Sequence, residues 1–148
     1  TKYETIIMDT GGRDTTSQRA ALSVANILLV PFVPRSFDVW TLEKVGELVT
    51  EIQTINPELI AYTFINRADP KGQDNDDAAE VLKETEALTF MDAKLGMRKA
   101  FSNAAATGLG VTESKPKDVK AIAEISTLFQ GVFNIEVTLT NSGDCNGD

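Results

Sequence analysis

Short apolar runs alternate with longer amphipathic segments along this chain, and that alternation restricts it to few folds. The runs are apolar on both faces, as in strands of a parallel sheet that helices cover on both sides. Strands are predicted over residues 3–10, 26–32, 59–67 and 89–93. Helices are predicted over 13–25, 36–55, 76–88, 98–108 and 115–135. We therefore expect an α/β fold, a three-layer Rossmann-like and mostly parallel sheet.

Two of the predicted helices have a clear buried face, because their apolar residues keep the three-to-four spacing of one helix side. In 36–55 these residues are Val39, Leu42, Val45, Leu48, Val49, Ile52 and Ile55. In 115–135, after Pro116, they are Val119, Ile122, Ile125, Phe129, Val132 and Phe133. Asp14, Thr15 or Thr16 is expected to cap the first helix, and Gly108 to end the fourth.

The chain needs only one domain, over residues 1–139, followed by a Gly- and Asn-rich tail over 140–148 that we expect to fray. No apolar run approaches the roughly 20 residues of a membrane span. Cys145 is the only cysteine, which excludes an internal disulfide and favours a cytosolic setting. Histidine is absent, so His-dependent triads and imidazole metal sites are excluded.

Charge is distributed unevenly along the chain, whose net charge is -8. Residues 93–121 contain six basic residues (Lys94, Arg98, Lys99, Lys115, Lys117 and Lys120) against Glu113 and Asp118, a net charge of +4 that leaves -12 elsewhere. Such a stretch is typical of a polyanion-binding surface, and equally of a solvated face on two helices.

Functional residues of parallel sheets gather at the carboxyl ends of the strands. We expect seven residues at that edge: Asp9, Gly11, Gly12, Pro31, Asn66, Arg67 and Asp92. Asp9 could cap a helix, but Asp14 or Thr15 suits that role better. Mg²⁺ is often held through one carboxylate and phosphate oxygens, and the glycines after Asp9 let backbone amides approach an anion. The pattern therefore indicates a magnesium–phosphate site.

Several ordered motifs resemble the ParA/MinD family of P-loop ATPases, and most closely its plasmid and chromosome partition members. They are the strand ending in "DTGG", the "RAAL" helix, "LLVP" followed by "SFD", the strand ending in "INR", and "RKAFSNAAATGLGVTE". The likeness covers residues 3 to about 133, nearly the whole chain.

The resemblance implies a role for each matching residue. Asp9 would hold Mg²⁺ through a water, and Thr10, Gly11, Gly12 and Arg13 would sense the γ-phosphate of ATP. Asn66 would hydrogen-bond the adenine edge, since its amide both donates and accepts. Arg67 would lie beside the base and Asp92 would form the opposite wall of its pocket. A loop cap is the alternative role for Asn66.

The resemblance also implies an ATP-dependent switch in DNA segregation. ATP binding would build a sandwich homodimer that binds DNA without sequence preference, and hydrolysis stimulated by a ParB-like protein would release it. The DNA-binding candidates are Arg98, Lys99, Lys115, Lys117 and Lys120. The expected location is the bacterial cytoplasm, at the nucleoid.

The chain departs from the family in having no G-x-x-x-x-G-K-S/T run. We therefore interpret it as the C-terminal portion of a longer ATPase, without the N-terminal strand and its P-loop. The resemblance implies that the P-loop strand lies in the sheet between strands 3–10 and 26–32, so its loss would leave the edges of both strands unpaired. The chain is then expected to close the gap, exchange with a second copy, or pair with the missing piece.

Two other interpretations remain. One is a non-hydrolysing DNA- or partner-binding module that keeps the fold and the basic surface. The other is a response-regulator type of protein with Asp9 as phosphoacceptor, which accounts for neither "INR" nor the "RKAFSNAAATGLGV" segment.

Overall fold

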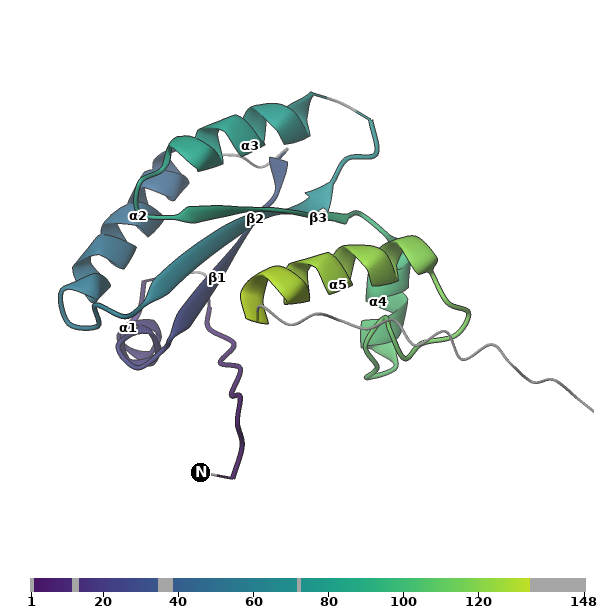
Figure 1. The fold of residues 1–148 in the computed structure, drawn as a ribbon, viewed down its shortest axis with the longest axis horizontal. Coiled ribbons are helices and arrows are strands. Elements are labelled where there is room, and N and C mark those ends of the chain that lie inside the picture. The colour runs from purple at the N-terminus through teal and green to yellow at the C-terminus, as the bar shows by residue number, and fades with distance from the viewer. Residues whose placement is uncertain (1, 12–13, 35–38, 72, 134–148) are drawn as a thin grey trace, which may run out of the picture. The chain divides into compact units, whose positions relative to one another are not determined.

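The computed structural model describes residues 2–11, 14–34, 39–71 and 73–133. The chain divides into two compact units, Thr1–Met97 and Arg98–Asp148, and each is described by itself. In chain order the elements are α1 (Thr16–Leu22), β1 (Ile27–Phe32), α2 (Val39–Gln53), β2 (Ile60–Ala68), α3 (Asp74–Glu84), β3 (Thr89–Gly96), α4 (Lys99–Ala106) and α5 (Val119–Phe133) (Figure 1).

The first unit contains a three-stranded parallel sheet in the order β1-β2-β3 (Figure 1). β1 pairs with β2 in an unbroken register from Ile27 opposite Ile60 to Phe32 opposite Ile65. The pairing of β2 with β3 is irregular at two places, between Thr63 and Ile65 and between Asn66 and Ala68. The predicted α/β fold with a parallel sheet is confirmed.

The core of this unit lies between one face of the sheet and helices α2 and α3. Val49 of α2, Ile65 of β2 and Leu82 of α3 are fully buried there. The buried hydroxyl of Thr63 donates to the carbonyl of Val30 at 3.1 Å, so this polar group keeps a partner. The two other long helices belong to the second unit, so helices on the opposite face of the sheet stay a prediction.

Helix α1 begins at Thr16 rather than at residue 13. Thr15, one of the three predicted caps, is its N-cap, and the Thr15 hydroxyl accepts from the backbone N–H of Gln18 at 3.2 Å. Leu22 packs with Ile52 and Leu59. On the surface, the guanidinium of Arg19 donates to Asp14 and to Glu51 of α2, both at 2.7 Å. These contacts fasten α1 to α2.

In the second unit, Ala104, Val111 and Ala121 form a small core, with Phe101 and Ile125 packed against it. Gly108 has a φ of 70° just beyond α4, as expected of the glycine predicted to end that helix. Asp118, which the sequence interpretation did not single out, caps α5. Its carboxylate accepts from the backbone N–H groups of Lys120 and Ala121 at 3.1 and 3.0 Å.

The predicted strand over 3–10 is wrong, because residues 2–11 form no strand in the structure. Tyr3, Ile6, Ile7 and Met8 have exposed fractions of 63%, 68%, 82% and 45%. An apolar run becomes a strand only where a neighbouring strand accepts and donates its hydrogen bonds. None of the described strands lies beside this run, so its apolar side chains stay in solvent.

Several boundaries and buried faces also differ from the predictions. Helix α3 begins at Asp74 and ends at Glu84, while β3 continues to Gly96 rather than ending at 93. In α5, Val119 and Phe129 are exposed, and the buried residues are Ala121 and Leu128. Ile55 lies beyond the end of α2 and is exposed. The side chain of Val39 and the predicted tail lie outside the described residues.

The Arg19 contacts predict a pH-dependent stability. Hydrogen bonds from Arg19 lower the pKa of both Asp14 and Glu51. Groups with lowered pKa values stabilise the fold above their unfolded pKa, near about 4, and lose that contribution as the pH falls through the folded value. Replacement of Arg19→Gln should therefore lower the urea midpoint at pH 7 and have less effect at pH 3.

Urea unfolding followed by circular dichroism measures both midpoints. Lys71→Gln is a matched control, because the described residues place no carboxylate in an ion pair with Lys71. An equal effect of Arg19→Gln at the two pH values would contradict the electrostatic role of this cluster.

Candidate functional site

The carboxyl end of β2 carries Asn66 and Arg67, the two predicted base-binding residues. Asn66 is half-buried and lies opposite Leu95 of β3. Its Oδ1 atom accepts from the backbone N–H of Arg67 at 2.9 Å. Arg67 is exposed and has a φ of 53°, a left-handed conformation that is uncommon outside glycine. The predicted location at the end of this strand is confirmed.

This geometry leaves one polar group of the Asn66 side chain without a partner among the described residues. Its Nδ2 group donates to none of the described residues, while its oxygen is already bonded to the backbone. An amide with a free N–H₂ suits an acceptor nitrogen on the edge of a base. The local bond to Arg67 is also what the alternative role of Asn66, a loop cap, requires. Both roles are compatible with this arrangement.

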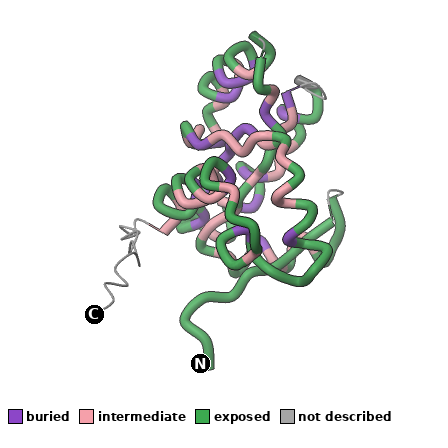
Figure 2. The backbone as a smooth tube through the Cα atoms, turned by 90° about the vertical axis from the view of Figure 1, so that its right-hand side faces the viewer, coloured by how far each residue is buried: buried purple, intermediate pink, exposed green. Residues whose placement is uncertain are grey.

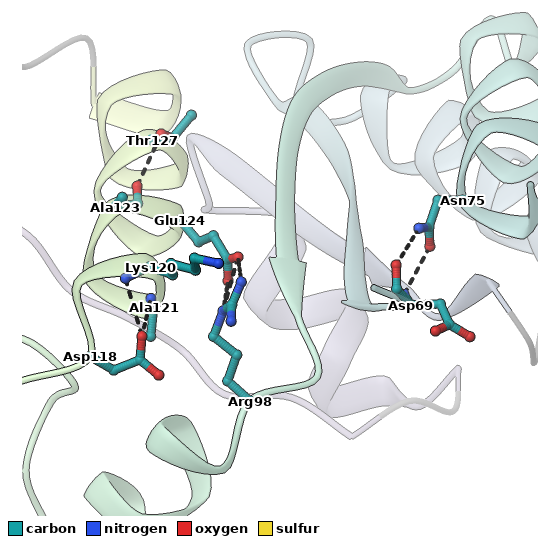
Figure 3. A network of polar contacts seen from close by, with 9 residues as sticks. All are labelled: Asp69, Asn75, Arg98, Asp118, Lys120, Ala121, Ala123, Glu124 and Thr127. Atoms are coloured by element: carbon teal, nitrogen blue, oxygen red, sulfur yellow. Dashed lines mark hydrogen bonds and ion pairs between the residues drawn. The ribbon is translucent and has the colours of Figure 1, made fainter. Parts of the chain in front are cut away.

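The loop after β2 is fixed by a pair of hydrogen bonds that the sequence interpretation missed. Asn75 donates from Nδ2 to the carbonyl of Asp69 at 2.8 Å and accepts from the backbone N–H of Asp69 at 3.1 Å (Figure 3). The only signal in the sequence is an Asn six residues after an Asp, at the start of a helix. These bonds hold the start of α3 against the end of β2, beside Asn66 and Arg67.

The residues predicted to bind magnesium and phosphate are not brought to this edge as parts of a sheet. Asp9, Thr10 and Gly11 lie in the exposed segment that forms no strand, and Gly12 and Arg13 lie outside the described residues. A Cβ atom added at Gly11 would meet no atom within 4 Å, so no close approach of the chain requires a glycine there.

Asp92 also lies elsewhere than expected. It is exposed inside β3, between Phe90 and Lys94, which pair with β2, and not at the end of the strand. The described residues contain no group of three or more acidic or sulfur ligands that could hold a metal ion. The described side chains around Asp9 therefore do not by themselves fit a magnesium ion, and the roles of Asp9 and Asp92 stay predictions.

The six basic residues of 93–121 fall into two groups. Lys94 is bonded to Asp76 at 3.1 Å. Arg98 forms an ion pair with Glu124 of α5, with distances of 2.5, 2.9 and 3.0 Å from its Nη2 and Nε atoms (Figure 3). The hydrogen bonds that Arg98 donates to Glu124 raise the pKa of Arg98, which keeps its charge. Arg98 is thus the weakest of the DNA-binding candidates.

The other group consists of exposed lysines of the second unit: Lys99, Lys115, Lys117 and Lys120. None of them forms an ion pair with a described carboxylate. Lys117 donates from Nζ to the carbonyl of Thr112, which leaves its charge without a counter-ion. An array of exposed ammonium groups can bind phosphates at little desolvation cost.

Comparison of the sequence with protein-family models and with curated proteins finds no match. None of the helices within the described residues is long and apolar enough to cross a membrane.

The two groups of basic residues should respond differently to neutralisation. The Arg98–Glu124 pair is half-buried, with side chains 30% and 21% exposed, so Arg98→Gln removes a positive charge and its hydrogen bonds from a partly buried carboxylate. We expect it to lower the free energy of unfolding by about 1–3 kcal/mol. The matched control Lys99→Gln should change it by no more than about 0.5 kcal/mol. Denaturant unfolding measures both values, and equal effects would contradict a structural role for Arg98.

Proposed function

We propose that the chain belongs to a DNA-segregation ATPase of the ParA type and carries its nonspecific DNA-binding surface. The observation that carries this proposal is the group of four exposed lysines in the second unit. These lysines support DNA binding. Asn66 and Arg67, at the carboxyl end of a parallel strand, support nucleotide binding, and the ordered ParA-like motifs support both functions.

DNA binding follows from the distribution of charge. The lysine surface (Lys99, Lys115, Lys117 and Lys120) presents ammonium groups to phosphates, each of which releases a counter-ion on binding. The first unit is acidic, with sixteen acidic and nine basic residues over 1–97. A polyanion is therefore repelled by the first unit, whereas residues 98–121 of the second unit, with five basic and two acidic residues, attract it locally. No base-reading geometry is needed, which suits binding without sequence preference.

The nucleotide part of the proposal assigns the free amide N–H₂ of Asn66 to the base edge. Arg67 would flank the base, since its side chain is exposed at the same strand end. ATP would supply the phosphoanhydride whose hydrolysis releases the DNA, and a ParB-like partner would stimulate that step. The active form would be a homodimer at the bacterial nucleoid. The described residues do not themselves build the magnesium site.

A non-hydrolysing DNA- or partner-binding module is the second candidate. One observation favours it: Asp9 lies in an exposed segment that forms no strand, so the structure does not place it at the edge of the sheet. Both candidates share the lysine surface, and they differ in nucleotide binding.

The lysine surface predicts a steep salt dependence of DNA affinity. A chain with all four lysines changed to Gln should bind a random-sequence duplex with a log K against log salt slope smaller by about 3–4, since each phosphate contact contributes about 0.9. Fluorescence anisotropy from low to moderate salt gives the slope.

A matched control changes Lys71→Gln and Lys83→Gln, exposed lysines of the acidic unit, and should leave the slope unchanged. Equal slopes for the wild-type chain and the four-lysine variant would reject DNA binding by this surface, and so would a chain that does not bind DNA at low salt.

Nucleotide binding separates the two candidates. If the ATPase proposal holds, calorimetry should detect Mg-ATP binding by this chain, and Asn66→Ala should weaken it about tenfold through loss of one hydrogen bond. Asn103→Ala, an exposed asparagine on α4, is the control. Absence of heat up to millimolar ATP, with DNA binding retained, would reject nucleotide binding by this chain on its own and the role of Asn66 in it.

A further inference from the structure

Residues 3–10, here called the N-terminal arm, are strand-like in sequence but unpaired in the structure. Ile6 and Ile7 are 68% and 82% exposed, and Figure 2 draws the arm as exposed along its length. The arm makes no backbone hydrogen bond with the rest of the described chain. Exposed adjacent isoleucines in an extended segment are costly in water, so the arm is suited to burial against a partner.

The outer edge of β1 is a second unpaired feature. The carbonyl of Asn26 accepts from the backbone N–H of Ile60, and the carbonyl of Val30 accepts from the side-chain hydroxyl of Thr63. The backbone groups of even-numbered residues in β1 therefore face β2. Backbone groups alternate in direction along a strand, so those of Ile27, Leu29 and Pro31 point away from the sheet. No described strand pairs with that side. The open edge thus offers two N–H donors and three carbonyl acceptors.

This edge lacks most of the usual protection against pairing. Exposed edge strands are normally guarded by charged residues, short length or bulges. The segment 26–34 has no charged residue, its pairing with β2 is regular, and Leu29 is 37% exposed. Pro31 is the single protective feature, because its nitrogen faces outward and carries no hydrogen. Such an edge accepts an added strand.

We propose that two copies of this chain exchange N-terminal arms, each arm adding a strand to the open β1 edge of the other copy. The lengths agree, because an extended eight-residue arm spans about 26 Å and the six residues of β1 about 20 Å. Arm and edge occur once in each chain and remain apart within it, so reciprocal exchange satisfies both in a closed two-fold dimer. The dimer needs no nucleotide and is independent of the proposed ATPase function.

Analytical ultracentrifugation of the full chain without nucleotide tests the exchange. The wild-type chain should be a dimer at micromolar concentration. Ile7→Lys introduces a charge into both exchanged strands, so its dimer dissociation constant should rise about a hundredfold or more. Ile55→Lys alters another exposed isoleucine, 67% exposed and outside the arm, and should leave the dimer unchanged. Both variants alter exposed side chains, so the monomer should fold in each.

A cross-link identifies the surfaces that meet. In a Cys145→Ser background, a tagged chain with Ile7→Cys is mixed with an untagged chain carrying Leu29→Cys and treated with a short bismaleimide. A tagged–untagged product is expected, and replacement of the second chain by one with Ile55→Cys should abolish it. A wild-type monomer, a dimer unaffected by Ile7→Lys, open-ended assembly, or the absence of a tagged–untagged product would each overturn the exchange.

Discussion

The parallel pairing of β2 with strands on both its sides is the interaction on which the rest of the first unit depends. Thr63 and Ile65 of β2 are fully buried. In addition to the backbone ladder, a hydrogen bond from the Thr63 hydroxyl links the strand to β1. Helices α2 and α3 pack on this strand through Val49 and Leu82. The same strand carries Asn66 and Arg67 just before its end at Ala68, so the position of the candidate site follows from the burial of β2.

The existence and order of most elements could be predicted, because apolar periodicity is a local property of the sequence. β1 differs from its predicted limits by one residue at its start, and β2 by one residue at each end. The arm could not be predicted, since the same apolar run is a strand beside another strand and an extended segment without one. In α5 the period is right, but how much of the apolar face is covered depends on the rest of the chain, and Val119 and Phe129 stay exposed.

In the candidate site, too, local features could be predicted from the sequence, whereas the partners of individual side chains could not. Asn66 and Arg67 could be located because a strand end is a local feature. Arg98 and Lys99 are adjacent and both basic, yet Arg98 is bonded to Glu124, 26 residues away, and Lys99 is exposed. Asp92 was expected near the end of a strand over 89–93, whereas the pairing of Lys94 with Ile65 and of Gly96 with Ala68 extends β3 beyond it.

Because of Pro31, pairing of another strand with the open edge of β1 is compatible with a site at the carboxyl end of β2. A strand added to that edge can accept hydrogen bonds from Ile27 and Leu29 but none from Pro31, because the proline nitrogen has no hydrogen. Pairing is therefore strongest along the first half of β1 and weakest at its carboxyl end. Across the sheet, Pro31 and Phe32 lie opposite Phe64 and Ile65, next to Asn66. An added strand would thus complete the sheet without having to cover the edge where Asn66 presents its free amide.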